Sequence, residues 1–178
     1  MIHDIEIVDI LDSMQPDEYS GSIWRTTWQG RSPLLGGTGG GRWSPSSGFE
    51  TLYTSFDKDT SISELHYHLS QAPVFSSSNV EIWELRIDKL QILNLSTNSA
   101  LNDLRINARN HSKEQLVHCQ KIGAAAYFLG HQGILVPSYR ASGTNCVIFS
   151  ERLDLDQLHE KSAQPINWPA WIKARKSK

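Results

Sequence analysis

The order of strand-like and helix-like segments constrains the fold of this chain more than any other feature. Short β-rich segments come first, a helical segment follows, and further strand-like segments lie before and after a second helix. Because strands and helices do not alternate regularly, the pattern disfavours a doubly wound parallel sheet and indicates an α+β domain. The polar pair Asp88 and Lys89 is expected to form a turn between the two central strands. The segments expected as strands are residues 23–27, 52–54, 79–87, 90–95, 133–137 and 145–149.

Two segments have the apolar spacing of amphipathic helices. In the first, which begins near Asp57, Ser61 and Glu64 stand three residues apart and match a capping box. The second covers residues 112–128, where small residues on one face permit close packing. Gly130 is placed to end this second helix.

Length and composition indicate one soluble domain. In 178 residues we expect a core of about residues 20–152 and a basic, partly disordered tail over residues 168–178. With 39% hydrophobic residues and a net charge of −2, neither a nucleic-acid nor a membrane partner is indicated. The acidic N-terminal segment does not resemble a signal peptide. Cys119 and Cys146 lack disulfide or metal spacing, so we expect reduced, buried thiols in a cytoplasmic protein.

Residues 36–41 contain five glycines and lead directly into Arg42. Neither common glycine-rich phosphate motif, the one ending in Gly-Lys-Ser/Thr or the G-x-G-x-x-G pattern, fits this stretch. Its backbone N–H groups could still approach a ligand closely, and the planar guanidinium of Arg42 suits phosphate or ribose oxygens. From the glycines alone, a mobile loop over residues 29–41 with a solvated Arg42 at the end of a strand is the favoured interpretation.

Other candidate residues have both a structural and a chemical interpretation. Glu64 can complete the capping box, or it can stabilise a cationic transition state as a carboxylate near a helix N-terminus. Tyr53 fits a core aromatic, and Ser138 fits a turn without the G-x-S-x-G pattern of a hydrolase nucleophile. His66 and His68 stand two apart, so on a helix they point about 200° apart and do not converge on a metal. We therefore expect no metal.

Six short stretches follow one another in an order that resembles a known family. They are WRTT, GGRWSP, LYTS, SISELHYH, QKIGAAAYFLG and GILVPSYRASGTNCVIF. Each is short, but the ordered set is similar to the RES domain, which is the toxin half of RES–Xre toxin–antitoxin pairs. The resemblance extends over residues 23–149, which is most of the chain.

The resemblance implies four central site residues. The arginine of the family's G-R-W/Y motif falls on Arg42, and the tyrosine of its L-Y-x-S strand falls on Tyr53. The glutamate of the following helix falls on Glu64, and the serine of the V-P-S motif falls on Ser138. All four positions hold the residue type that the family pattern requires.

Two further residues match the family pattern, and two features of the sequence differ from it. Arg25 corresponds to the arginine of the family's early strand, and Asn145 lies where the family often has asparagine before its last core strand. Ser44 stands where asparagine is common in the family, and residues 96–111 match poorly. No site residue is therefore assigned within residues 96–111.

The resemblance implies an ADP-ribosyltransferase-like fold, with a split β-sheet and flanking helices, that binds NAD as substrate. The implied reaction cleaves the nicotinamide–ribose bond, with water, phosphate or a protein side chain as the acceptor. Arg25, Arg42, Tyr53 and Asn145 are expected to bind NAD, and Glu64 to stabilise the oxocarbenium-like ribose. Tyr53 would stack on nicotinamide, Arg42 would bind pyrophosphate or ribose, and Ser138 would fix Glu64 or the substrate. A cognate Xre-type antitoxin is the implied partner.

Two alternatives to an NAD-cleaving enzyme remain open on the sequence. One is a non-catalytic NAD-binding or antitoxin-binding module with the same fold. The other is a metal-dependent nuclease that uses the histidines. A homo-oligomer is compatible with the sequence, which contains no coiled-coil or interface motif.

Overall fold

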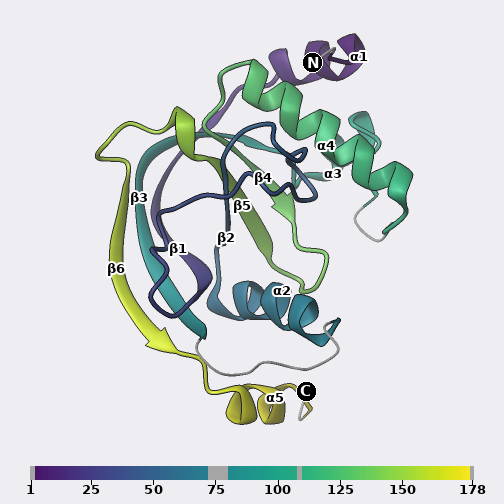
Figure 1. Cartoon of the computed structure of the whole chain (residues 1–178). Coiled ribbons are helices and arrows are strands. Elements are labelled where there is room, and N and C mark those ends of the chain that lie inside the picture. Colours follow the sequence, from purple (N-terminus) through teal and green to yellow (C-terminus); the bar gives the residue numbers. More distant parts are fainter. Residues whose placement is uncertain (1–2, 72–79, 108–109, 177–178) are drawn as a thin grey trace.

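The computed structural model describes residues 3–71, 80–107 and 110–176 (Figure 1). In this part of the chain, helices flank a mixed β-sheet. In chain order the elements are α1 Ile5–Asp12, β1 Asp17–Trp28, β2 Thr51–Ser55, α2 Lys58–Ser70, β3 Val80–Asn94, α3 Asn98–Asp103, α4 Lys113–Phe128, β4 Gly133–Pro137, β5 Thr144–Phe149, η1 Ser150–Arg152, β6 Leu158–Pro165 and α5 Trp168–Lys176.

The sheet consists of two groups of strands joined at their margins. The strand order is β1-β2-β5-β4-β3-β6, and β1 also pairs with β3 in a long antiparallel ladder. The groups β6-β3-β1 and β2-β5-β4 meet through a short parallel β3–β4 pairing and through one β1–β2 pair, Trp24 with Ser55. Figure 1 shows the first group as a curved ribbon along one side of the molecule. The predicted α+β class, with a split sheet and flanking helices, is confirmed.

The expected turn at Asp88 and Lys89 is wrong, because the two predicted central strands form one strand, β3. Lys89 has a positive φ of 50°, and the β1–β3 register shifts opposite it. The Lys89 N–H donates to Ser20 Oγ at 2.8 Å, which satisfies the amide that the bulge removes from the ladder. The strand therefore bends without reversing direction. The first residue of the predicted strand, Asn79, lies outside the described residues.

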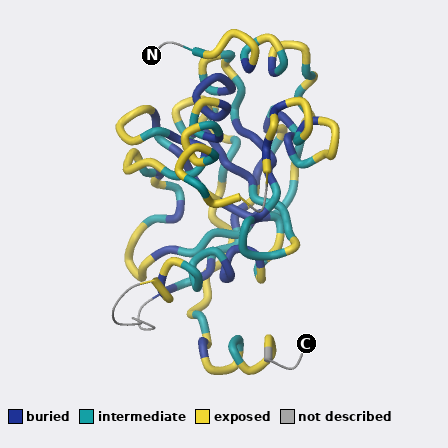
Figure 2. Tube along the Cα trace, turned by 90° about the vertical axis from the view of Figure 1, so that its right-hand side faces the viewer, coloured by how far each residue is buried: buried dark blue, intermediate teal, exposed yellow. Residues whose placement is uncertain are grey.

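Three clusters of buried side chains form the interior, which Figure 2 shows as the dark centre of the trace. The first joins α1 and α4 to β4 and β5, and includes Trp43 from the glycine-rich loop. The second lies between the long β1–β3 ladder and the inner strands β2, β4 and β5. The third packs α2 and α5 against β3. Both ends of α2 are thus anchored by buried apolar contacts.

Helix α4 packs directly on the backbone of the glycine-rich loop. Ser112 caps the helix by accepting from the Gln115 N–H at 3.2 Å, and Gly130 follows its end with a φ of +86°, as predicted. At Gly123, a Cβ atom would collide with the carbonyl oxygen of Trp43. Only glycine allows α4 to approach so closely, so this residue fixes the position of the loop that contains Arg42.

The two cysteines are buried and free, as the sequence indicated. Burial raises the pKa of the Cys146 thiol to about 12. Cys146 is therefore an unreactive thiol of the interior rather than a nucleophile.

The segment expected as a partly disordered tail forms helix α5, and the strand β6 before it was not predicted. Trp168 is 3% exposed in the cluster with α2 and β3. The Trp171 Nε1–H donates to Asp59 Oδ1 at 2.8 Å, and Arg175 donates to Ser63 Oγ. The two tryptophans order a segment whose charge alone suggested a solvated end. None of the described helices has the length and apolar character needed to cross a bilayer.

Replacing Gly123 with alanine is expected to lower the free energy of unfolding by about 1–3 kcal/mol, the usual cost of overpacking an interior contact. The new methyl group must displace either α4 or the Trp43 backbone. Thermal unfolding followed by circular dichroism measures the effect. Gly39→Ala is the matched control, because a Cβ there meets nothing within 4 Å and the change should be close to neutral. Equal melting temperatures for the two variants would contradict the packing described here.

Candidate active site

Helix α2 begins at Lys58, close to the start near Asp57 that the sequence indicated, but its cap differs from the predicted one. The residue that caps it is Asp57, whose Oδ1 accepts from the Thr60 N–H at 2.7 Å. The predicted capping box of Ser61 and Glu64 is therefore wrong, because both residues lie inside the helix. Asp57 and Ser61 are both good capping residues, and the end of β2 at Ser55 decides between them. As a result, the Glu64 carboxylate is not used to cap the helix.

Glu64 instead accepts two hydrogen bonds from the inner strands. Ser138 Oγ donates to Glu64 Oε1 at 2.6 Å, and Asn145 Nδ2 donates to the same oxygen at 2.9 Å. Within the described residues, Oε2 has no hydrogen-bond partner. Both donors are neutral, so the carboxylate is oriented without being neutralised. Its full charge and one free oxygen remain available to a ligand.

The two donors are themselves held in place. Ser138 is 8% exposed, and its Oγ accepts from the backbone N–H groups of Arg140 and Ala141, both at 3.1 Å. Asn145 Oδ1 accepts from Ser55 Oγ at 2.7 Å, which orients the Asn145 amide so that its nitrogen faces Glu64. Three of the predicted residues, Glu64, Ser138 and Asn145, thus form one hydrogen-bonded cluster across α2, β4 and β5.

Tyr53 anchors the glycine-rich loop. The Trp43 N–H donates to Tyr53 Oη at 3.1 Å, and Ser44 Oγ lies 3.1 Å from the same oxygen. A Cβ at Gly41 would collide with this hydroxyl. Burial of the hydroxyl raises the pKa of Tyr53, against the opposing effects of its hydrogen bonds to Ser44 and Trp43. The residue as a whole is 37% exposed, so the ring remains accessible while its hydroxyl is enclosed.

The glycine-rich loop, expected to be flexible, is tied down at three points. Gly37 pairs with Thr51 through N–H···O contacts of 2.9 and 3.1 Å. The Gly41 N–H donates to the Ser44 carbonyl at 2.8 Å, and the Ser47 N–H donates to the Thr38 carbonyl at 2.8 Å. Arg42 therefore extends from a defined backbone.

Arg42 and Arg140 lie on either side of His111. Arg42 Nη2 is 3.0 Å from His111 Nδ1, and Arg140 Nη1 is 3.4 Å from His111 Nε2. The Arg42 guanidinium stacks on the Tyr139 ring at 3.4 Å from its centroid, and that of Arg140 stacks on Tyr67 at 3.2 Å. Burial, followed by Arg140 and Arg42, lowers the pKa of His111, while Glu64 has the opposite effect. The imidazole is therefore close enough to Glu64 to sense its charge.

Arg25, like Arg42 and Tyr53, is not part of the hydrogen-bonded cluster around Glu64. Its Nη1 donates to the Pro33 carbonyl at 2.5 Å, and it lines a cavity of about 160 Å³ together with Arg31 and Leu65 of α2. Burial, reinforced by Arg31, lowers the pKa of Arg25 to about 10. The structure places it next to α2 but gives it no hydrogen bond to Glu64.

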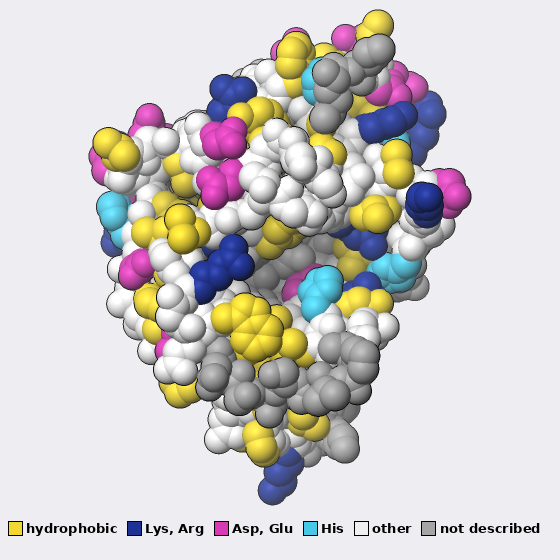
Figure 3. All heavy atoms as spheres, viewed as in Figure 1, with side chains coloured by type: hydrophobic (Ala, Val, Ile, Leu, Met, Phe, Trp, Pro, Cys, Tyr) yellow, Lys and Arg dark blue, Asp and Glu magenta, His cyan; other side chains and the backbone are white. Residues whose placement is uncertain are grey.

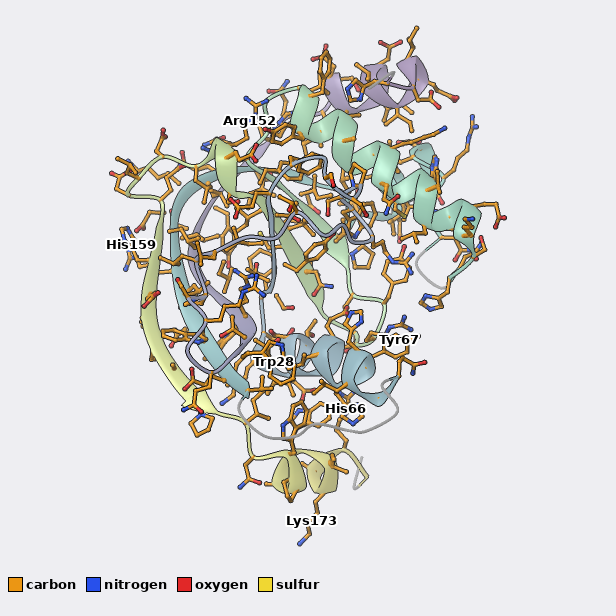
Figure 4. The ribbon with its side chains drawn as sticks, viewed as in Figure 1. Trp28, His66, Tyr67, Arg152, His159 and Lys173 are labelled. Carbon is orange, nitrogen blue, oxygen red and sulfur yellow. The ribbon has the colours of Figure 1, made fainter. Side chains whose placement is uncertain are left out.

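The face of the molecule seen in Figure 3 is concave. Figure 3 shows a hollow in the middle of the face above α2, bordered by Lys or Arg side chains and a histidine. A second cavity of about 380 Å³ lies between α2 and α5, and Arg140, Tyr67 and Arg175 line part of it. Figure 4 shows His66 on the side of α2 that faces α5. Arg140 thus lies at the edge of this second cavity as well as beside His111.

The histidines of α2 face aromatic rings or solvent. The His66 ring is 5.1 Å from that of Trp171, and His68 is exposed. Among residues 3–71, 80–107 and 110–176, no group of three or more His, Cys, Asp or Glu side chains is arranged to hold a metal ion.

Sequence reasoning missed two residues beside the predicted site, His111 and Arg140. His111 falls in the segment that matches the family pattern poorly, and nothing local marks its role. Arg140 lies within the quoted stretch SYRASGT, two residues after Ser138. That proximity to a predicted site residue was the available signal for Arg140.

Comparison with known proteins identifies the family. The RES domain model matches residues 20–170, so the chain belongs to the RES domain family. Curated relatives are the proteins called NAD(+) phosphorylase MbcT in Mycobacterium tuberculosis and Mycobacterium bovis. Each is 25% identical over 159 residues, which cover 85% of this chain and 86% of the relative.

A solved structure supports the same fold. The crystal structure of the M. tuberculosis MbcT–MbcA toxin–antitoxin complex matches with a TM-score of 0.85 at 24% identity. The match covers 97% of this chain and 98% of the matched chain. The arrangement of sheet and helices described above is therefore shared with that structure.

Asn145→Asp is expected to make stability depend on pH. The substitution places a second carboxyl group at the position of the Nδ2 donor, 2.9 Å from Glu64 Oε1, so one of the two groups must stay protonated. In the unfolded chain both groups ionise with ordinary pKa values of about 4, so stability is lost as pH rises from about 4 through the raised pKa of the folded pair. Denaturant unfolding measures the free energy of unfolding at pH 5 and at pH 8. Between these values the variant should lose at least about 1.4 kcal/mol more than the wild type, which corresponds to one pKa unit.

Asn102→Asp is the control, because Asn102 is exposed on α3. If the two variants had the same pH dependence, the contact between Asn145 and Glu64 would be contradicted.

Proposed function

We propose that this protein cleaves the nicotinamide–ribose bond of NAD and acts as the toxin of a toxin–antitoxin pair. The observation that supports this most directly is the Glu64 carboxylate, which two neutral donors hold on one oxygen while the other has no partner within the described residues. Expulsion of nicotinamide leaves positive charge on the ribose. A fixed, uncompensated carboxylate stabilises such charge without having to reorganise.

The reaction needs no acid for its leaving group. As the bond between C1″ of the ribose and the pyridinium nitrogen breaks, its electron pair leaves with the nitrogen and nicotinamide departs neutral. Glu64 Oε2 contacts the ribose hydroxyls and stabilises the cationic ribose. Ser138 and Asn145 act through Glu64 by fixing its carboxylate.

The remaining residues bind and orient NAD. The accessible ring of Tyr53 stacks on nicotinamide, while its hydroxyl holds the glycine-rich loop. Arg42 binds a phosphate or ribose oxygen of NAD through its fork of N–H donors. Arg25, beside α2, contributes a second guanidinium at the margin of the site.

Inorganic phosphate is the acceptor in this proposal. The curated relatives are named NAD(+) phosphorylases, which favours phosphate over water or a protein side chain. An unprotonated phosphate oxygen forms the new bond to C1″ as nicotinamide leaves, so no proton has to move in that step. The products are nicotinamide and the 1″-phosphate of ADP-ribose, which mass spectrometry distinguishes from free ADP-ribose.

A cognate antitoxin that covers the site is the proposed partner, of the Xre type that the family resemblance implies. The matched structure is that of a toxin–antitoxin complex, which supports this kind of partner. Co-expression with the product of a neighbouring gene should restore both growth and cellular NAD in bacteria that express this chain.

Glu64→Gln is expected to reduce the rate of NAD cleavage by at least about 100-fold, the usual cost of removing a preorganised electrostatic contact. Glutamine keeps an oxygen that can accept from Ser138 and Asn145, so the fold and the melting temperature should change little. Liquid chromatography of NAD and nicotinamide after incubation with purified protein and phosphate gives the rate.

The control is Glu160→Gln on the exposed strand β6, which removes the same charge far along the chain from α2 and should leave turnover unchanged. Full turnover by Glu64→Gln would refute the assigned role. The alternative of a non-catalytic NAD-binding module predicts that NAD raises the melting temperature of the wild type yet remains intact after long incubation.

A further inference from the structure

Three nitrogen-rich side chains converge beside Glu64 from separate parts of the chain. Arg42 comes from the glycine-rich loop, His111 immediately precedes α4, and Arg140 lies between β4 and β5. The two guanidiniums contact opposite nitrogens of the same imidazole at 3.0 and 3.4 Å. This arrangement brings at least two positive charges to one point.

Hydrogen-bond donors exceed acceptors in this group. A neutral imidazole has one donor nitrogen and one acceptor nitrogen, whereas a guanidinium has donors only. His111 can therefore accept from Arg42 or from Arg140, but not from both, and its own N–H then faces the other guanidinium. Within the described residues, no carboxylate lies within 4.0 Å of Arg42 or Arg140. Among the described residues the Asn110 carbonyl accepts from Arg42 Nη1 at 3.4 Å, but no charged acceptor faces the group, and an anion would supply one.

Aromatic stacking holds the two guanidiniums in defined planes. Arg42 lies over Tyr139 and Arg140 over Tyr67, at 3.4 and 3.2 Å from the ring centroids. Stacking occupies the flat faces of the guanidiniums and leaves their N–H edges to bind oxygen atoms. Because the planes are fixed before a ligand arrives, less side-chain entropy is lost on binding.

The group is coupled to the Glu64 cluster through the backbone. The Arg140 N–H donates to Ser138 Oγ at 3.1 Å, and Ser138 Oγ donates to Glu64. The lowered pKa of His111 has Arg140 and Arg42 among its causes, with Glu64 opposing them. A negative centre for a cationic ribose therefore lies next to a positive centre suited to an anion.

We propose that Arg42, His111 and Arg140 form a binding site for a phosphate group. The proposed function supplies two sources for this group, free inorganic phosphate as the acceptor and the pyrophosphate of NAD, and in this respect the inference rests on that function. Both present phosphate oxygens that accept from guanidinium edges and from a protonated imidazole. The role of His111 and Arg140 is to bind and position the anion beside the carboxylate.

Isothermal titration of the purified full chain with inorganic phosphate, and separately with NAD, tests the site. Arg140→Gln and His111→Gln are each expected to weaken binding of the anion by about tenfold or more, because each removes a charge-assisted hydrogen bond. Arg152→Gln is the matched control, since Arg152 also stacks on a tyrosine ring, 4.5 Å from the centroid of Tyr127. Figure 4 shows Arg152 in the upper part of the molecule, well away from Tyr67 beside α2.

The two titrations separate the sources of the phosphate group. A loss of affinity for inorganic phosphate, with NAD affinity within about twofold of the wild type, supports the acceptor phosphate as the ligand. A loss of affinity for NAD, with affinity for inorganic phosphate within about twofold of the wild type, supports the pyrophosphate of NAD as the ligand. If neither affinity changes more than in Arg152→Gln, the proposed site is overturned.

A measurement on the wild type avoids any effect of substitution on folding. Sulfate keeps its charge across neutral pH, and its binding should raise the pKa of His111, as followed by NMR, because an anion stabilises the protonated imidazole among Arg42, Arg140 and Glu64. An unchanged His111 pKa at saturating sulfate would count against the site.

The outcome for the site is distinguishable from that for the activity. If the variants lose phosphate affinity but the wild type leaves NAD intact, the site stands and the proposed function fails. If the wild type cleaves NAD and both variants bind phosphate and NAD as the wild type does, the site fails alone.

Discussion

The structure of the site depends on one carboxylate that receives its hydrogen bonds from neutral groups. Ser138 and Asn145 fix the position of Glu64 Oε1 but leave its charge uncompensated. An arginine or lysine in either position would hold the carboxylate equally well and cancel the field that a cationic ribose requires. Neutral partners thus orient the Glu64 carboxylate without cancelling its charge. For these hydrogen bonds to form, α2 must lie at a fixed distance from the ends of β4 and β5.

Several contacts outside the site maintain that distance. Asp57 begins α2 immediately after β2, so that Glu64 lies within the helix and faces the inner strands. Tyr53 and Gly123 position the glycine-rich loop, one through its hydroxyl and the other through the absence of a side chain. Ser44, which departs from the family pattern, bonds to both Tyr53 and Thr51 and strengthens this attachment. The glycines of this loop therefore allow close packing as well as a wider range of backbone conformations.

Helices and strands with a strong local pattern were predicted correctly from the sequence. The predictions failed where contacts with distant residues determine the structure. The apolar strands β4 and β5 and the helix α4 have strong local patterns and were found with nearly correct bounds. The capping box predicted for α2 was wrong because Asp57 and Ser61 are both good capping residues, and the end of β2 favours Asp57. The Asp88–Lys89 pair forms a bulge rather than a turn because β1 pairs with both halves of β3. Strand β6 is exposed and polar, so it has no apolar alternation to reveal it.

Several residues of the site could be predicted from the sequence, but their contacts could not. The resemblance supplied Arg42, Tyr53, Glu64, Ser138 and Asn145 as separate positions, and the structure brings the last three into direct contact. Their hydrogen bonds join residues more than 70 positions apart, which spacing along the chain cannot reveal. His111 was out of reach for the same reason, since it meets Arg42 and Arg140 only after α4 has packed on the sheet.

The close approach of Gly123 to Trp43 has a consequence for genetic screens. A selection for inactive variants of this chain would recover substitutions at Gly123 alongside those at Glu64, because a side chain there would displace the Trp43 backbone next to Arg42. Such variants would be read from sequence alone as evidence for a ligand contact on α4. Their true effect would be steric, transmitted through the Trp43 carbonyl to a loop about 80 residues away in the chain.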